Sequence, residues 1–408
     1  MWLSIKHWLD WARNDVLPLT RTRPHGQAVH TRYEKAGLAF YDLPVPWNAD
    51  AVVVEVLLRL PPAARRKTDF TLRLPGREAV AAESLRAEAG DRHRLVFRLL
   101  VPEATTAGEL LWKNRFLARV PVAVLTEHAF LAGLRLTLPT VGVRLGAQTV
   151  AAQTFVASQC KGLTASCVLR SPTPLAPLAD LGLAVGFRGE RTGAVYDVPV
   201  ALSSSQLGAT EALVAAAAPK HPRRLGAWSV VWRVGGREVC SQRVQGIPAK
   251  RFEQSLRVAD ARFVVGDKAG GVTVVRQPPP AGEAARLGPC FLVASSEPGM
   301  AGMCRLQVRV TGAGGAGPDP VMEQDVLVTD GPAVFAPGLL DAADLARVSG
   351  FELRHKGRVL GVASLSPVPT AALTAEGGFK PPPEFPWSVA ADDELSDRLG
   401  RLMGGGEG

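Results

Sequence analysis

The segment Val156–Leu169, VASQCKGLTASCVL, has a counterpart in Val293–Leu306, VASSEPGMAGMCRL, and this match is the strongest indication of the fold. Both segments begin Val-Ala-Ser, carry a glycine at the same offset and end in Cys-x-Leu. Apolar residues occupy alternate positions after the glycine, which predicts a strand, a short connection and a second strand. We interpret the match as one hairpin-like unit used twice, 137 residues apart (Val156 and Val293).

Each unit is expected to close with a hairpin. In the first unit apolar residues alternate over residues 228–234, and Gly235-Gly236 supplies a turn that tolerates positive φ before a partner strand. In the second unit the alternation covers residues 351–355, and Gly357 provides the turn. Six or seven short strands in about 110 residues is the density of a β-sandwich.

A more distant copy is expected to precede these two units, because Ala51–Leu60, Phe70–Leu74, His93–Val101 and Leu110–Leu125 form a plausible antiparallel set. Length, alternation and the closing hairpins resemble bacterial immunoglobulin-like (Ig-like) or fibronectin-like domains in series, over about Asp42 to Pro367. The resemblance implies a mostly β protein of tandem antiparallel β-sandwich domains, with short amphipathic helices at both termini. The Cys, Trp, Cys arrangement of immunoglobulin domains is imitated once, by Cys167, Trp228 and Cys240.

These patterns predict five regions. They are an N-terminal amphipathic helix and basic linker (1–30), a first β-sandwich-like domain (31–130), two Ig-like β-sandwich domains (131–250 and 251–368), and a Pro-rich linker with a C-terminal amphipathic helix (369–408).

The formal net charge of +9 is unevenly distributed along the 408 residues. From Ala371 onward seven acidic residues face three basic ones, so this tail carries −4 and the rest +13. Such an excess can attract phosphates or an anionic membrane, although a compositional bias toward arginine gives the same balance. Two basic clusters lie in expected loops without the aromatics that stack on nucleic-acid bases, so no nucleic-acid partner is predicted. The basic-patch candidates are Arg65, Arg66, Lys67, Lys220, Arg223 and Arg224.

The first dozen residues have the pattern of a short amphipathic helix. Its apolar side would hold Trp2, Ile5, Trp8 and Leu9. Three roles stay open: packing on the protein's own first sandwich, docking in a partner's groove, or weak binding at a membrane surface.

A stiff, extended spacer is predicted for Lys380–Trp387, KPPPEFPW, because consecutive prolines favour polyproline II. Ser388 can cap a helix beyond it, with acidic residues in the first turn. An amphipathic helix on a tether suits partner docking, and packing on its own chain is the alternative. The docking candidates here are Trp387, Leu395, Leu399, Leu402 and Met403.

No catalytic motif is recognisable. The seven histidines are scattered, and no zinc-protease helix, phosphate-binding loop or nucleophile elbow occurs. The five cysteines form no CxxC pair and have apolar neighbours, which is typical of reduced core residues. We therefore predict no enzyme, no cofactor and no metal site.

The predicted function is a non-enzymatic scaffold or adaptor that docks other proteins in a multi-protein bacterial assembly. One alternative is a peripheral membrane or polyanion-binding module, and another is an enzyme whose site is assembled from dispersed loop residues. A cytoplasmic location is expected, because no long apolar span occurs and the N-terminal segment is interrupted by charges. The sequence does not determine the oligomeric state.

Overall fold

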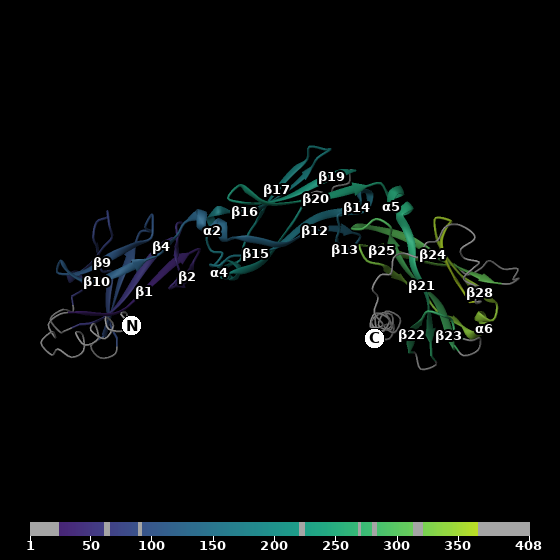
Figure 1. The fold of residues 1–408 in the computed structure, drawn as a ribbon, viewed down its shortest axis with the longest axis horizontal. Coiled ribbons are helices and arrows are strands. Elements are labelled where there is room, and N and C mark those ends of the chain that lie inside the picture. Colours follow the sequence, from purple (N-terminus) through teal and green to yellow (C-terminus); the bar gives the residue numbers. More distant parts are fainter. Residues whose placement is uncertain are drawn as a thin grey trace, which may run out of the picture.

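The computed structural model describes residues 24–60, 66–88, 92–219, 225–267, 271–279, 284–312 and 321–365. Three β-sandwiches follow one another along the long axis of the molecule (Figure 1). The predicted mostly β architecture of tandem Ig-like sandwiches is confirmed. The amphipathic helices expected near Trp2 and Leu395 lie outside the described residues.

The first sandwich contains β1 to β11. One sheet has the order β2-β1-β4-β8-β7, the other has the order β10-β9-β5-β6, and β3 pairs with β11 in parallel. Its strands and its short helix are β1 (His25–Lys35), β2 (Leu38–Tyr41), β3 (Val45–Pro46), β4 (Ala51–Arg59), η3 (Lys67–Asp69), β5 (Phe70–Arg73), β6 (Val80–Ala81), β7 (Ser84–Ala87), β8 (Arg92–Leu99), β9 (Thr106–Trp112), β10 (Arg115–Val122) and β11 (Val124–Leu125).

The second sandwich contains β12 to β20 and follows the linker helix α2. One sheet is β13-β12-β15-β18, and the other runs β17-β16-β19-β20-β14 and continues into the third sandwich. Its elements are α2 (Glu127–Gly133), β12 (Arg135–Leu145), β13 (Gln148–Ala151), β14 (Thr154–Val156), η4 (Ala157–Gln159), β15 (Cys160–Arg170), α3 (Leu178–Leu181), β16 (Leu183–Gly189), β17 (Val195–Val200), α4 (Ser204–Gly208), β18 (Glu211–Ala217), β19 (Gly226–Val234) and β20 (Arg237–Ile247).

The third sandwich contains β21 to β29 and follows the linker helix α5. One sheet has the order β22-β21-β23-β26, and β27 also pairs with β23. In the other sheet β24 pairs with both β25 and β28, and β28 pairs with β29. Its elements are α5 (Ala249–Ser255), β21 (Leu256–Gly266), β22 (Val272–Val275), β23 (Arg286–Ser295), β24 (Met300–Gly312), β25 (Val321–Val328), β26 (Ala333–Phe335), β27 (Leu340–Asp341), α6 (Ala342–Leu345), β28 (Val348–His355) and β29 (Arg358–Ser364).

All three sandwiches share one strand plan. The first long strand of each (β1, β12 and β21) carries a β-bulge and then forms a hairpin with a short strand. The last two sandwiches also share a linker pattern, because Phe130 and Leu134 in and after α2 match Phe252 and Leu256 in and after α5. Both phenylalanines are almost fully buried. The bulge bends each first strand at its start, and the phenylalanine fixes the helix that precedes it.

The sequence match that predicted the repeat has the wrong register. Residues 156–169 cover the end of β14 and most of β15, whereas residues 293–306 cover the end of β23 and the start of β24. The strand equivalent to β15 is β23, because each pairs with the first long strand of its sandwich. The closing hairpins were predicted correctly, and their positive-φ turn residues Gly236 and Gly357 are 121 residues apart. Any two alternating strands joined by glycine can be aligned, so the match did not determine which strands were equivalent.

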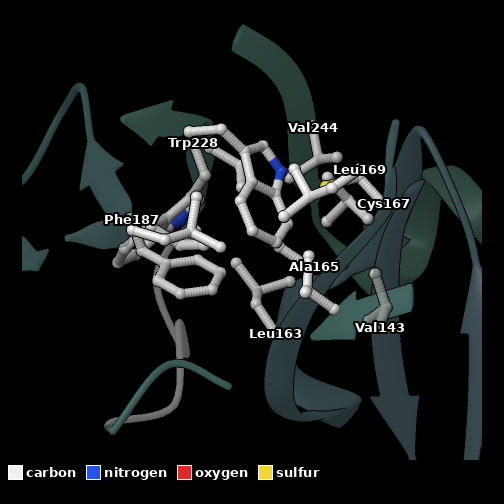
Figure 2. Packing of buried hydrophobic residues seen from close by; sticks show 14 of the residues in the cluster. Val143, Leu163, Ala165, Cys167, Leu169, Phe187, Trp228 and Val244 are labelled. Carbon is white, nitrogen blue, oxygen red and sulfur yellow. The ribbon is translucent and has the colours of Figure 1, made fainter. Parts of the chain in front are cut away.

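The core of the second sandwich explains why alternation was a reliable guide. Inward residues of β15, from Leu163 to Leu169, meet Phe187, Trp228 and Val244 of the opposite sheet (Figure 2). Trp228 is 4% exposed and Phe187 is fully buried. Each such aromatic side chain contributes about 2 kcal/mol of apolar burial. Inward positions are therefore fixed by the core, which leaves the outward positions of the same strands available for function.

Candidate docking face and the two junctions

An uncharged face lies on the outside of the second sandwich, on the sheet that contains β12, β15 and β18. The strand registers place its outward residues in three consecutive rows of three. We call these nine residues the β12–β15–β18 face. The rows are Thr137, Val168 and Leu213; Thr140, Ser166 and Ala215; and Gly142, Thr164 and Ala217.

The threonine hydroxyls of this face hydrogen-bond to the protein's own backbone. The Thr137 hydroxyl donates to the carbonyl of Val168 at 3.2 Å, and the Thr140 hydroxyl donates to the carbonyl of Leu138 at 3.2 Å. These hydroxyls therefore already have partners within the protein, and the Leu213 side chain beside them is 68% exposed. A sheet face exposed to water normally carries polar and charged side chains on its outward positions, and the three rows of this one hold no charged residue.

The face has charged ends and a strained edge. Arg170 and Glu211 form an ion pair at 3.0 Å beyond the first row, and exposed Arg144 lies beyond the third row. At the bulge of β12, Leu138 has a φ of 50° and is 75% exposed. A left-handed conformation is costly for leucine, and such strain is often found at functional positions. The bulge therefore presents a second large apolar side chain at the edge of this sheet.

The equivalent face of the first sandwich is covered by charge pairs. Arg94 contacts Glu55 at 2.9 Å and Glu88 at 2.7 Å, and Arg98 contacts Glu34 at 2.6 Å. The aliphatic parts of these long arginine side chains can cover apolar surface of the sheet while their charged ends stay in water. Charged groups therefore lie across this face.

The equivalent face of the third sandwich is covered by its own chain. Val264 and Cys290 on this face are fully buried, and Leu339 packs against them. The covering segment lies so close that a side chain at Gly288 would meet the carbonyl oxygen of Gly338 at 2.0 Å. Among the residues that the structure describes, only the second of the three equivalent faces is both uncharged over three rows and uncovered.

Side chains hold the junction between the first two sandwiches. Lys35, which is 2% exposed, hydrogen-bonds to Asp50 of the first sandwich and Asp180 of the second. Partial burial raises the pKa of Asp50, but its hydrogen bonds with Lys35 and the Ala36 amide outweigh this, so the pKa is lowered overall. Trp47 and Phe130 pack with ring centroids 5.9 Å apart. The junction thus combines a buried cation with an aromatic contact.

Backbone pairing holds the junction between the second and third sandwiches. β14 pairs in parallel with β20 on one side and β24 on the other, which joins the two sandwiches in one sheet. The Gln159 side chain donates to the carbonyl of Met303 at 2.7 Å and accepts from its amide at 2.8 Å. Phe252 and Val156 lie so close to Gly302 that a side chain there would meet each at 2.8 Å.

Most residues predicted as partner or polyanion sites lie in parts of the chain that the structure does not describe. Arg66 and Lys67 are exposed at η3, and the Lys67 ammonium donates to the carbonyl of Glu83 at 3.1 Å. Arg65, Lys220, Arg223 and Arg224 and all nine terminal docking candidates lie outside the described residues. The β12–β15–β18 face was missed. Its outward residues on β15 carry no charge from Gly162 to Val168, but the sequence does not show that β12 and β18 flank that strand.

The described residues offer little for catalysis. A shallow depression in the first sandwich is lined by Arg73, Arg77 and Glu109, and Arg73 and Glu109 are paired at 2.5 Å. No group of three or more His, Cys, Asp or Glu residues in the described ranges could hold a metal ion. All five cysteines are free. Burial raises the pKa of the Cys290 thiol to about 12, and the Cys167 and Cys304 thiols are raised similarly, so they are poor nucleophiles.

No helix in the described part of the chain is long and apolar enough to cross a membrane. No protein-family model matches the chain. No curated protein matches it in sequence.

Solved structures show likeness at the level of the fold. The Escherichia coli adhesin FdeC is 13% identical over 79% of this chain and 93% of that one, with a TM-score of 0.24. Domains 1–6 of the surface layer protein SbsC are 13% identical over 83% of this chain and 38% of that one, with a TM-score of 0.28. InvD of Yersinia pseudotuberculosis is 10% identical over 82% and 97%, with a TM-score of 0.23.

These likenesses contradict the predicted cytoplasmic location, because FdeC is an adhesin and SbsC belongs to a surface layer. That expectation rested on the absence of a long apolar span and on charges in the N-terminal segment, and neither determines where a β-sandwich protein acts. Identities of 10% to 13% with TM-scores below 0.3 transfer no activity to this chain. The chain consists of tandem Ig-like β-sandwich domains similar in fold to those of bacterial adhesins and surface layer proteins.

Proposed function

We propose that this protein is a non-enzymatic scaffold that holds three Ig-like sandwiches in series and recruits a partner protein through the β12–β15–β18 face. A single observation carries the proposal: three rows of this face are uncharged and uncovered, while the first sandwich covers its equivalent face with ion pairs. Exposed apolar patches on soluble proteins commonly mark interaction sites.

The junctions support the scaffold role. β14 joins the second and third sandwiches through backbone hydrogen bonds, and Lys35 bridges the first and second. Such contacts hold neighbouring domains in fixed orientations, so a partner on the middle sandwich would lie at a defined position between two others. The work of such a protein is positioning within a multi-protein assembly.

Site-specific photo-crosslinking in the producing organism tests the proposal. A photoreactive residue replaces Leu213 on the face or, as a matched control, Val195, which is 55% exposed on the opposite sheet. We expect a discrete protein adduct from position 213 only, and we expect Val168→Arg in the same chain to abolish it. Equal adducts at both positions, or an adduct that survives Val168→Arg, would reject the face as the docking site.

A further inference from the structure

We propose that in the free protein the β12–β15–β18 face is occupied by the chain's own C-terminal segment, residues 388–403, which a partner must displace. This inference rests on the proposed function only in assigning the partner to the same face. The segment would act as an internal mask for the exposed methyl groups and Leu213.

The size of the face favours a single helix over a second copy of the protein. Three strands spaced about 4.8 Å apart and three rows about 7 Å apart give an area of roughly 300 Å². A stable interface between two globular proteins buries about 800 Å² on each partner, so this face alone fits one helical segment, from the chain itself or from a partner, and not a second globular copy. A helix of 16 residues is about 24 Å long and 10 Å wide, which matches the length of the face.

The sequence of the segment complements the face. Leu395, Leu399, Leu402 and Met403 fall on one side of a helix, and they would meet the uncharged rows around Val168. The small, exposed outward residues Ala215 and Ala217 leave room for leucine side chains beside Leu213.

The charges are also complementary. The first half of the segment contains Asp392, Asp393 and Glu394, and the segment belongs to a tail of net charge −4. Arg144 and Lys161 are exposed at the end of the face that lies nearer the third sandwich, where Arg144 donates to the Lys161 carbonyl at 3.2 Å. A chain arriving from the third sandwich would bring its acidic end to these basic residues first.

The connection is long enough. The last described residue is Leu365, and residues 366–387 can span up to about 70 Å when extended. β29 starts at the α5 linker, where Arg358 donates to the Glu253 carbonyl at 2.8 Å, and its seven residues run about 24 Å from there. From Cys160 at that junction to Ser166 on the face is roughly 20 Å along β15. The return path is therefore well within reach.

Intramolecular crosslinking of the full chain tests the mask. Leu213→Cys with Leu399→Cys, in a Cys240→Ser background, is treated with a short bismaleimide at low protein concentration. The matched control pairs Leu399→Cys with Leu100→Cys, which places a cysteine at an 82% exposed position in the first sandwich. We expect at least fivefold more intramolecular product from position 213. Equal yields, or a product of twice the mass, would overturn the proposal, the latter in favour of a second copy.

A second full-length variant keeps the test decisive. Leu395→Asp with Leu399→Asp should raise the maleimide labelling rate of a cysteine at position 213 at least threefold, while Asp397→Ser on the opposite side of the helix should leave it unchanged. An unchanged rate in the double variant would overturn the mask. A partner adduct at position 213 without a crosslink to the tail would support the proposed function and reject the mask. A crosslink to the tail without a partner adduct would support the mask and reject the proposed function.

Discussion

The outer faces of the first and second sandwiches are built on equivalent strands in the same order, yet one carries charged side chains and the other carries none in its three central rows. On the first, Arg94 and Arg98 pair with acidic residues across the sheet. On the second, the corresponding rows hold threonine, serine, valine and alanine, with Leu213 exposed. The fold requires only inward residues to be apolar, so the outward ones are free to serve solubility in one sandwich and contact in the next.

The largest expected effect concerns the third sandwich, where the equivalent face is covered. Gly288→Ala should destabilise the protein by about 2 kcal/mol, because the new Cβ would meet the Gly338 carbonyl and displace the covering segment. Denaturant unfolding measures this, and thiol labelling should show faster reaction of the uncovered Cys290. Gly331→Ala is the control, since nothing lies within 4 Å of its added Cβ. Equal stability of the two variants would show that the cover does not depend on this contact.

The next effect concerns how the first and second faces are held relative to each other. Lys35→Met should destabilise the first junction by about 1 kcal/mol, a modest value because both carboxylate partners are more than half exposed. Spin labels on the two sandwiches should then give a broader distance distribution. Lys113→Met, which removes an exposed lysine 3.8 Å from Asp69, should leave the distribution narrow. A narrow distribution in both variants would mean that the remaining contacts, Trp47 with Phe130 and Asn48 with the Pro177 carbonyl, are enough to hold the junction.

Acid should loosen the same junction. Because the folded pKa of Asp50 is lowered, its contribution is complete above the unfolded value of about 3.9 and is lost as the pH falls through the folded value. The label distances between the first two sandwiches should therefore stay constant from pH 8 to 5 and broaden below about pH 4. Broadening between pH 7 and 6 would point to a histidine instead.

A smaller effect is expected from removing charge on the first face. Arg94→Leu should cost less than about 1 kcal/mol, because its ion pairs with Glu55 and Glu88 are solvent-exposed. The variant should bind more of an apolar dye than the parent, since it brings the first face closer in character to the second. No change in dye binding would mean that charge pairs are not what distinguishes the two faces.

The smallest effect on stability is expected on the second face itself. Val168→Arg lies on an outward position and should change the free energy of unfolding by less than about 0.5 kcal/mol. Loss of more than 2 kcal/mol would show that the side chain is part of the core and not of a contact surface. Thermal unfolding provides the measurement, with Val195→Arg on the other sheet as the control.

Much of the fold could be predicted from local patterns, because alternation around Trp228 and Phe351 and the glycine turns at Gly236 and Gly357 are short-range signals. The register of the repeat could not be predicted, because inward and outward residues alternate in every strand and any two strands can therefore be aligned. The β12–β15–β18 face could not be found either. Its three strands are separated by up to about 80 residues in the chain, and their adjacency follows from sheet pairing alone.

The most direct test asks whether the second face is covered in the working protein. Carbene footprinting within the producing cells labels exposed aliphatic side chains in proportion to their accessibility. We expect Leu213 to be labelled several-fold less than its 68% exposure implies, while Leu100 and Phe116 of the first sandwich are labelled as their exposures of 82% and 57% require. Full labelling of Leu213 would contradict the account, because the face would then contact neither a partner nor the protein's own tail.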